Sequence, residues 1–256
     1  MLILLPPSEG KSVPTRGKPL DLSAFGAPTL TAARERVIDA LVALADDPDA
    51  AAILGLGATQ GHLVDLNAEL RTAPTARAEK VYTGVLYDAL DLASMSTGAR
   101  RRANTRVAIV SSLFGLVRPH DRIPSYRLSG DVTLPGLGPV AGLWRDRLGE
   151  AVRHALGGGL LVDLRSTTYA NFWRPDADVA RRTATVRVLH EVAGTRKVVS
   201  HFNKATKGRI VRSLLTEGVS PRNPLALADN LRDLGWFVET TQQAHGHQLD
   251  VIVDDI

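Results

Sequence analysis

The sequence of 256 residues contains no cysteine, which excludes several kinds of chemistry at once. Without thiols the chain forms no disulfide and no thiolate metal site, and it cannot reduce peroxide through a sulfenic acid. Any iron would have to bind histidine or carboxylate side chains. His245 and His247 could share one face of a strand, but no third ligand accompanies them. We therefore identify no cofactor and predict no metal site.

The chain also lacks a long apolar run. Its opening, MLILLPPSEGK, holds an aliphatic stretch too short for a secretory core, with no basic segment before it. Nothing elsewhere approaches the roughly 20 apolar residues of a membrane span. We therefore expect a cytoplasmic protein with no membrane partner.

Charge of one sign is not in large excess either. Lys plus Arg number 31 and Asp plus Glu number 27, so the formal net charge is +4. Such a balance permits a polyanionic partner without requiring one. Hydrophobic residues make up 44% of the chain and charged residues 23%, which is enough apolar material for a folded core and excludes disorder as the starting class.

Short aliphatic runs alternate along the chain with stretches of helical periodicity. The runs are bounded by Pro, Gly or polar residues, as interior strands are. With no repeat and no long linker, we predict one domain over residues 1–256. We expect it to be α/β or α+β, with a mixed central sheet flanked by helices. The predicted strands are residues 1–5, 107–110, 160–162, 197–200 and 251–253, and the predicted helices cover residues 37–44, 140–152 and 203–215.

Five segments carry polar residues that follow neither period, at predicted strand ends, where folds place binding sites. Together they resemble the YaaA family of peroxide-stress proteins, and the match covers most of the chain. The opening segment departs from the commoner family pattern, which is similar to SPAK. In chain order the segments are PPSEGK from residue 6, KVYTG from residue 80, SSLFGLVRPHDRIPSYRL from residue 111, VDLRSTTY from residue 162 and SHFNKATKGR from residue 200.

The resemblance implies a protein that lowers free intracellular iron, limits DNA damage under hydrogen peroxide and binds double-stranded DNA non-specifically through a helix-hairpin-helix element. We place that element at residues 53–70, where Gly55, Gly57 and Thr59 lie between two predicted helices. Backbone N–H groups there would meet DNA phosphates without reading bases, so binding would weaken with salt. A plain turn between two helices is the alternative, because acidic residues flank the hairpin.

The turn after the first strand could present three polar groups to one cleft: the Ser8 hydroxyl, the Glu9 carboxylate and the Lys11 ammonium. We take all three as candidate catalytic residues, and Ser8 and Lys11 also as ligand-binding residues. The fragment EGKS is not a phosphate-loop motif, because Leu5 stands where that motif needs glycine. A turn that merely ends the strand is the alternative.

The loop at residues 111–128 is the strongest single candidate for an anion site. It carries Arg118, Tyr126 and Arg127 as predicted ligand-binding residues, and guanidinium forks suit planar carboxylate or phosphate groups. Asp121 is a candidate catalytic residue in the same loop. An internal ion pair between Arg118 and Asp121 is the alternative.

The helix after residue 200 directs two lysines inward. At about 100° per residue, Lys204 and Lys207 fall on its apolar side. Burying ammonium groups costs several kcal/mol unless they meet an opposite charge. We therefore predict either one wall of an anion pocket, with Lys204 also a catalytic candidate, or an internal network with Glu9 or Asp163. His201, beside these lysines, is a candidate acid or base.

Ser166 and Tyr169 follow the predicted strand at residues 160–162. Side chains at the carboxyl end of a sheet are displayed to a ligand, so both are candidate ligand-binding residues. Capping of a helix by Ser166 is the alternative.

Two functions remain open. The first is a binding protein that engages DNA and reduces oxidative damage, as the resemblance implies. The second is an enzyme that acts on a phosphate- or carboxylate-bearing small molecule, such as a nucleotide or nucleobase, in a basic cleft. Polar residues drawn from five separate segments are more typical of a small-molecule site than of a broad DNA-binding face. The sequence does not decide whether the chain is an enzyme.

Overall fold

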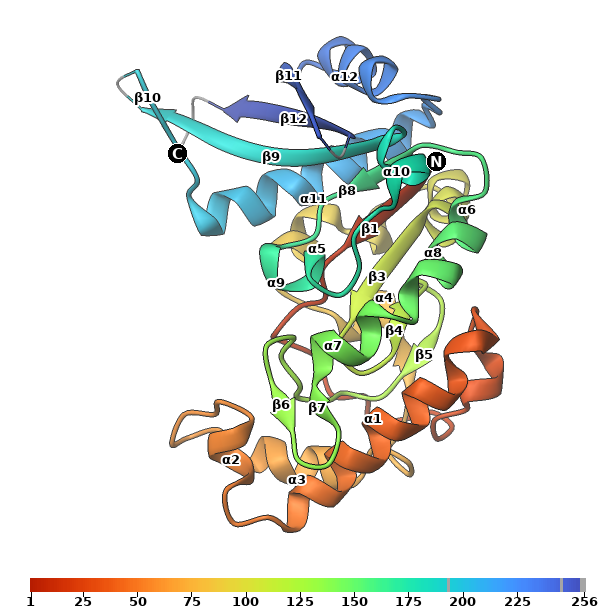
Figure 1. The fold of residues 1–256 in the computed structure, drawn as a ribbon, viewed down its shortest axis with the longest axis vertical. Coiled ribbons are helices and arrows are strands. Elements are labelled where there is room, and N and C mark those ends of the chain that lie inside the picture. Colours follow the sequence, from red (N-terminus) through yellow and green to blue (C-terminus); the bar gives the residue numbers. More distant parts are fainter. Residues whose placement is uncertain (193, 245, 254–256) are drawn as a thin grey trace.

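The computed structural model describes residues 1–192, 194–244 and 246–253, except for the side chains of residues 192, 200 and 201. Its centre is an eight-stranded mixed sheet against which helices pack (Figure 1). The predicted α/β class with a mixed central sheet is thereby confirmed. Within the described ranges, no helix has both the length and the apolar character needed to cross a membrane.

The strands of the central sheet are β1 (Leu2–Leu5), β3 (Val107–Ser111), β4 (Gly115–Val117), β8 (Leu161–Asp163), β9 (Thr183–Val192), β10 (Thr195–Lys197), β11 (Phe237–Gln243) and β12 (Gly246–Val253). Their order is β11-β12-β9-β8-β1-β3-β4, with β10 paired to β9. The pairs β1–β3, β1–β8, β8–β9 and β9–β12 are parallel, whereas β4, β10 and β11 pair antiparallel. Two small sheets join β2 (Ala76–Arg77) to β5 (Arg122–Ile123) and β6 (Thr133–Leu134) to β7 (Gly138–Pro139).

Four of the five predicted strands coincide with β1, β3, β8 and the end of β12. The continuous aliphatic run of β1 follows from its place between two parallel neighbours, because all four of its residues are fully buried. The strand predicted at residues 197–200 is wrong, because β10 ends at Lys197 and a helix begins at Ser200. Sequence reasoning missed β9 and β11, in which polar and charged residues interrupt the apolar pattern.

Helices and turns connect the strands. The stretch at residues 140–152, predicted to be helical, is two helices, α7 (Val140–Arg145) and α8 (Leu148–Leu156), with a break at residues 146–147. The 3-10 helices lie at Leu22–Ala24, Pro28–Leu30, Leu44–Asp46 and Leu92–Ser94. The α-helices are α1 (Thr31–Ala43), α2 (Ala50–Ile53), α3 (His62–Ala68), α4 (Ala78–Val81), α5 (Val85–Leu90), α6 (Thr97–Arg106), α7 (Val140–Arg145), α8 (Leu148–Leu156), α9 (Thr167–Ala170), α10 (Ala177–Ala180), α11 (Ser200–Glu217) and α12 (Pro224–Asp233).

The long helix α11 packs tightly against α5, and a glycine makes the contact possible. A Cβ atom at Gly208 would lie 2.3 Å from the backbone oxygen of Leu86, so no larger residue fits at this crossing. The close contact brings the first two turns of α11 beside the start of α5, next to the carboxyl end of β1 (Figure 1).

A buried arginine closes the β4 edge of the sheet. The Arg34 guanidinium, on α1, is fully buried and donates to the backbone oxygens of Phe114 and Leu116 at 3.0 and 3.1 Å. It also donates to the Gly26 oxygen and lies 4.9 Å from the centre of the Phe25 ring. Arg34 thus ties the segment before α1 to the sheet through carbonyl groups.

Candidate functional site

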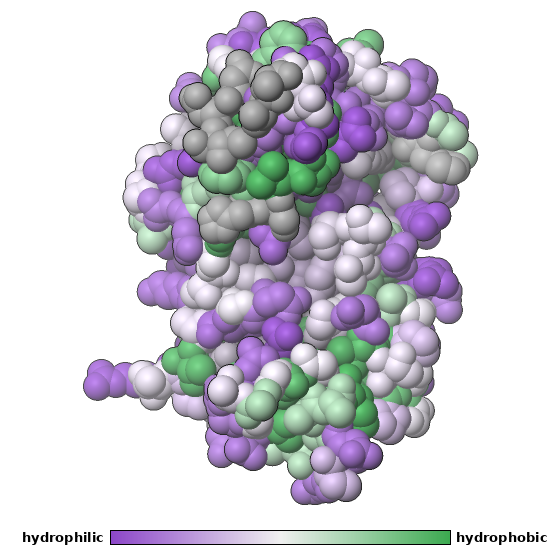
Figure 2. Space-filling view, turned by 90° about the vertical axis from the view of Figure 1, so that its left-hand side faces the viewer, coloured by the Kyte–Doolittle hydropathy of each residue, from purple (hydrophilic) through white to green (hydrophobic). Residues whose placement is uncertain are grey.

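The carboxyl ends of β1, β3 and β8 meet at one edge of the sheet. The chain passes from β1 to β3 on one side, and β8 pairs with β1 on the other, so the strand order reverses at β1. Open α/β sheets bind ligands at such switch points. Figure 2 views the molecule from the left-hand side of Figure 1, toward which β1 runs, and shows hydrophilic residues across the middle of that face.

A cavity of about 300 Å³ lies at this switch point, and we call it the crevice. It brings together five of the predicted site residues, Ser8, Glu9, Ser166, Tyr169 and Lys204, from three of the five polar segments. It is lined by residues 6–10 after β1, residues 83–87 at the start of α5, Ser166, Tyr169 and Lys204.

The turn after β1 is held in shape by its own polar side chains. The Ser8 hydroxyl donates to the Gly10 oxygen at 2.6 Å and accepts from the Thr83 N–H at 3.1 Å. The Lys11 ammonium donates to the Ser8 oxygen at 2.7 Å and lies 4.3 Å from the centre of the Tyr126 ring. Burial lowers the pKa of Lys11 to about 8. Lys11 therefore supports the crevice from behind and does not line it.

Tyr126 belongs to a buried hydroxyl network beneath the turn. Its hydroxyl lies 2.9 Å from that of Tyr82 and 2.8 Å from that of Ser111, and the residue is 2% exposed. Burial raises the pKa of Tyr126 to about 12, so the hydroxyl stays protonated at neutral pH. The predicted ligand-binding role of Tyr126 would therefore act through Lys11 and the turn.

Glu9 and Arg127 form an ion pair at the rim of the crevice. Arg127 Nη1 lies 2.5 Å from Glu9 Oε2, and the Ser129 hydroxyl is 3.5 Å from the other carboxylate oxygen. The Arg127 backbone is fixed by Asn67, whose amide donates to the Arg127 oxygen and accepts from its N–H, both at 2.8 Å. Arg127 thus combines a fixed backbone with a side chain that pairs with a residue lining the crevice.

A buried ion pair shapes the segment after β8. Arg165 donates to both carboxylate oxygens of Asp163, at 2.9 and 2.7 Å, and also to the backbone oxygens of Tyr169 and Trp173. Burial by itself raises the pKa of Asp163, but Arg165 outweighs it and holds that pKa below its usual range. Sequence reasoning missed Arg165, although its place two residues after a strand-end aspartate was a usable signal.

Tyr169 is the most informative side chain in the crevice. It is 5% exposed, and within the described part of the chain no group meets its buried hydroxyl with hydrogen-bond geometry. The Ser112 hydroxyl is near enough to lower the Tyr169 pKa against the effect of burial, but it already donates to the Leu128 oxygen at 2.6 Å. Burial raises the pKa of Tyr169, so the group is a neutral donor. Ser166, one turn earlier, precedes α9 without capping it through its side chain, which leaves its exposed hydroxyl free to meet a ligand.

The two lysines of α11 have different surroundings. Lys207 donates to the Leu164 backbone oxygen at 3.1 Å, and its pKa is lowered by burial although Asp163 counteracts the shift. Lys204 is exposed and lines the crevice. Of the two predicted anion-binding lysines, only Lys204 reaches the cavity, while Lys207 ties α11 to the segment after β8.

Arg118 and Asp121 do not line the crevice. Arg118 Nη1 donates to the backbone oxygens of Thr105 and Val107, at 3.2 and 3.1 Å. The Asp121 carboxylate is buried and accepts from the Arg118 backbone N–H at 2.7 Å. Arg127 does not line the crevice either, but it meets Glu9 at the rim, so the loop at residues 111–128, predicted as one anion site, divides into Arg127 and a turn fixed by Asp121.

The predicted helix-hairpin-helix element is not confirmed. In place of a tight hairpin, eight residues (54–61) separate two short helices, α2 and α3. Gly55 has a φ of 64° and is exposed, as are Gly57 and Thr59. The Gly57 N–H already donates to the Gln60 side chain at 3.1 Å.

The histidine predictions fall largely outside the described residues. The side chain of His201 and the whole of His245 belong to the part that the structure does not describe. Among the residues that are described, no group of three or more His, Asp or Glu side chains is arranged to hold a metal ion.

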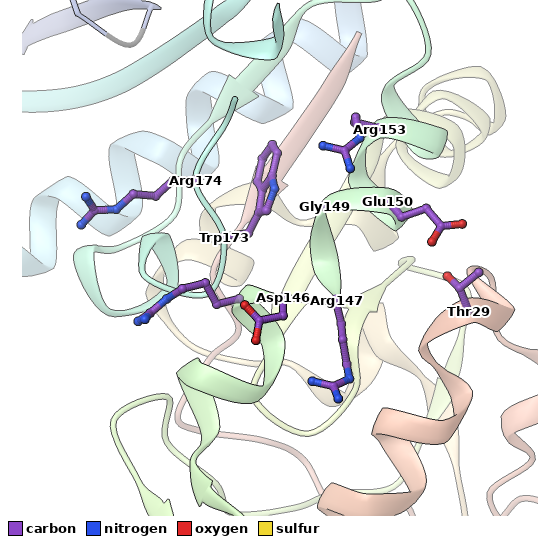
Figure 3. Close-up of a pocket in the computed structure, with 9 residues that line it drawn as sticks. Thr29, Asp146, Arg147, Gly149, Glu150, Arg153, Trp173 and Arg174 are labelled. Atoms are coloured by element: carbon purple, nitrogen blue, oxygen red, sulfur yellow. The ribbon is translucent and has the colours of Figure 1, made fainter. Parts of the chain in front are cut away.

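A larger cavity that sequence reasoning missed lies beside α7 and α8 (Figure 3). We call it the arginine hollow; its volume is about 580 Å³. Figure 3 shows the side chains of Arg147, Arg153 and Arg174 pointing in different directions. Arg153 pairs with Asp176 at 2.8 Å. The hollow is lined by Thr29, Arg145, Asp146, Arg147, Gly149, Glu150, Arg153, Trp173 and Arg174.

The fold and the crevice together define a mixed α/β protein with a polar cavity at the switch point of its sheet. A family model described as peroxide stress protein YaaA matches residues 1–239. The chain therefore belongs to the YaaA family, which confirms the resemblance drawn from the five polar segments.

Relatives across the whole chain carry the family designation UPF0246. One from Streptomyces coelicolor is 53% identical over 261 residues, with both chains fully covered. One from Corynebacterium efficiens is 42% identical, covering 94% of this chain and 96% of the relative. One from Corynebacterium glutamicum is 38% identical, covering 99% of this chain and all of the relative.

Proposed function

We propose that this YaaA-family protein binds an anionic small molecule, a phosphate- or carboxylate-bearing compound such as a nucleotide, in the crevice. The observation that supports this most directly is the buried Tyr169 hydroxyl, which lacks a partner among the described residues. An unsatisfied buried hydroxyl costs about 1–3 kcal/mol, so a ligand acceptor at this position would recover that energy.

The walls of the crevice indicate the shape of the ligand. Pro6, Pro7, Val85 and Leu86 supply apolar surface, and Tyr87 is fixed by a 2.7 Å hydrogen bond to the Pro6 oxygen. Small-molecule sites typically combine such walls with a few placed polar groups. Here those groups are the Ser166 and Tyr169 hydroxyls, the Glu9 carboxylate and the Lys204 ammonium. We assign no reaction to them.

Substitution of Lys204 tests the proposal. We expect the wild-type protein to co-purify with an anionic small molecule and Lys204→Ala to lose it, because the ammonium provides the positive charge at the crevice. Denaturing mass spectrometry of the purified protein measures this. Arg209→Ala is the matched control, since Arg209 is exposed on the same helix and does not line the crevice. Equal occupancy in both variants would show that the crevice is not the binding site.

We further propose that the ligand links the protein to the peroxide response in the cytoplasm, where it would limit oxidative DNA damage. The description of the matching family model supports this role. In a strain that lacks the gene, wild-type protein and Arg209→Ala should restore survival in hydrogen peroxide, and Lys204→Ala should not. Full restoration of survival by Lys204→Ala would show that ligand binding in the crevice is not needed for the role in the peroxide response.

Non-specific DNA binding is a second proposal, favoured by one observation: the exposed Gly55 lines a cavity together with Arg127. A phosphate there would meet both backbone and guanidinium. We expect duplex affinity to fall steeply with salt and to weaken in Gly55→Asn, because asparagine tolerates the positive φ of 64° but adds a side chain at the cavity wall. If duplex affinity changed neither with salt nor with this substitution, the loop at residues 54–61 would be excluded as the DNA contact.

A further inference from the structure

A second cavity lies next to the crevice, and the ion pair between Glu9 and Arg127 separates the two. A second hollow of about 380 Å³ lies on the other side of Arg127. Glu9 lines the crevice, Arg127 lines the second hollow, and their side chains meet at 2.5 Å. The pair is therefore a partition between two cavities. The second hollow is lined by Ile53, Leu54, Gly55, Arg127, Ser129, Asp131, Val132 and Thr133.

The partition is built so that its side chains can exchange partners. The Glu9 side chain is 52% exposed and the Arg127 side chain 18%, so solvent screens the pair from the carboxylate side and the pair contributes only about 1 kcal/mol. Within the described residues, Arg127 Nε is buried without a hydrogen-bond partner, so the guanidinium can still donate a hydrogen bond that it does not make in its present position. The backbone of Arg127 is held on both sides by Asn67, which leaves the side chain as the moving part.

An anionic group in the second hollow would compete with Glu9 for Arg127. Phosphate accepts the guanidinium fork with two oxygens, as a carboxylate does, and adds acceptors for the Ser129 and Thr133 hydroxyls. Asp131 in the same wall repels further negative charge, which favours one phosphate group over a polyphosphate chain. The displaced Glu9 carboxylate then becomes an acceptor for N–H or O–H groups of a ligand in the crevice.

We propose that the crevice and the second hollow form one bipartite site for a nucleoside monophosphate. The nucleoside occupies the crevice, and its phosphate replaces Glu9 on Arg127. This inference rests on the proposed function of the crevice and names its ligand class. The apolar and aromatic walls of the crevice suit a planar base, and the second hollow supplies a separate place for the charge.

The test compares nucleosides with their 5′-monophosphates by isothermal titration calorimetry. The four common ribonucleosides and their monophosphates are the probes, and the readout is the affinity ratio of each pair. We expect the wild type to bind the monophosphate about 10- to 100-fold more tightly, the usual strength of charged hydrogen bonds. Arg127→Gln should bring the ratio close to one. Arg77→Gln, a half-exposed arginine outside both cavities, is the control for net charge.

Glu9→Gln provides the second arm, because it removes the competitor and keeps the side-chain shape. The ratio should rise by about two- to fivefold, in line with the modest strength of an ion pair whose carboxylate is half exposed. A ratio that is unchanged or lower in Glu9→Gln overturns the partition, even if Arg127→Gln fails to fold.

The outcomes also separate this inference from the proposed function. Binding of a nucleoside and its monophosphate with equal affinity, lost in Lys204→Ala, would overturn the role of Arg127 and leave the crevice as a binding site. Binding of neither probe would overturn the nucleotide inference, and occupancy of Lys204→Ala by the co-purifying molecule would then decide the proposed function alone.

Discussion

The crevice and the arginine hollow show that the number of arginines is a poor guide to a binding site. The arginine hollow is larger and is lined by four arginines, yet each of them already donates to a protein oxygen. The crevice has one lysine and a buried hydroxyl with no described partner. The crevice differs from the arginine hollow because it has a polar group that is still available to hydrogen-bond a ligand, at the switch point of the sheet.

Arg165 connects the two regions, so its replacement should have the largest effect. It donates to the Tyr169 oxygen beside the crevice and to the Trp173 oxygen beside the hollow. Arg165→Met leaves the Asp163 carboxylate buried without its partner, and we expect a loss of about 3–5 kcal/mol in the free energy of unfolding. Urea denaturation measures this.

The control for Arg165→Met is Arg181→Met, whose ion pair with Asp178 is 73% and 70% exposed and should contribute almost nothing. The double variant Asp163→Asn/Arg165→Met should be more stable than Arg165→Met alone, because no buried charge remains. Equal stability of Arg165→Met and wild type would mean that Lys207 neutralises Asp163 unaided.

Tyr169→Phe should separate binding from stability. Removal of a buried hydroxyl that has no described partner relieves its desolvation cost, so the free energy of unfolding should not fall and should rise by up to about 1–3 kcal/mol. If the hydroxyl donates to the ligand, affinity falls about tenfold, as for the loss of one hydrogen bond of about 1.4 kcal/mol. Titration calorimetry and thermal melting on the same preparation measure both. A variant that loses stability and keeps affinity would assign Tyr169 to the core.

The support of the crevice by Lys11 should appear in the pH dependence of stability. Burial lowers the pKa of Lys11 from 10.5 to about 8. Between these values the unfolded chain binds more protons than the folded one, so the free energy of unfolding rises with pH from about 8 upward. Below pH 8 both states are protonated and the cost of burying the charge is fully present.

Lys11→Met should flatten this rise. Urea titrations of both proteins between pH 7 and about 9.5, below the range where tyrosines ionise, provide the comparison. The amino terminus, whose pKa is also lowered by burial, contributes equally to both proteins and cancels in the difference. Parallel pH curves would show that the Lys11 ammonium is solvated.

The central strands and the identity of the crevice-lining turns could be predicted from the sequence, because buried parallel strands are short aliphatic runs and ligands bind at their carboxyl ends. Ser8 and Ser166 were found in this way and do line the crevice; Lys204, which helical periodicity singled out, lines it as well. Partner choice could not be predicted. Arg118 and Arg127 occupy the same loop, but one donates to backbone carbonyls and the other meets Glu9. Such choices depend on tertiary distances that no local pattern encodes.

β9 and β11 escaped prediction for a related reason. Their charged residues form ion pairs across strands, such as Arg187 with Asp250 and Arg196 with Glu239. In the sequence of one strand, such a charged residue is typical of an exposed loop, because its ion-pair partner belongs to another strand. The break between α7 and α8 is likewise invisible in an apolar periodicity that continues through it.

The smallest effect should come from the arginine hollow, where Arg174→Gln sharpens the contrast with Lys204→Ala. Both substitutions remove one exposed positive charge. Arg174 makes one described hydrogen bond, 3.3 Å to the Asn171 side chain. Stability should therefore change by less than about 0.5 kcal/mol. Ligand affinity should stay within about twofold, because the charge lies outside the crevice and is screened by salt. A loss of affinity as large as that in Lys204→Ala would mean that the guanidinium groups of the arginine hollow exchange their protein partners for a ligand, and it would reverse the comparison between the two cavities.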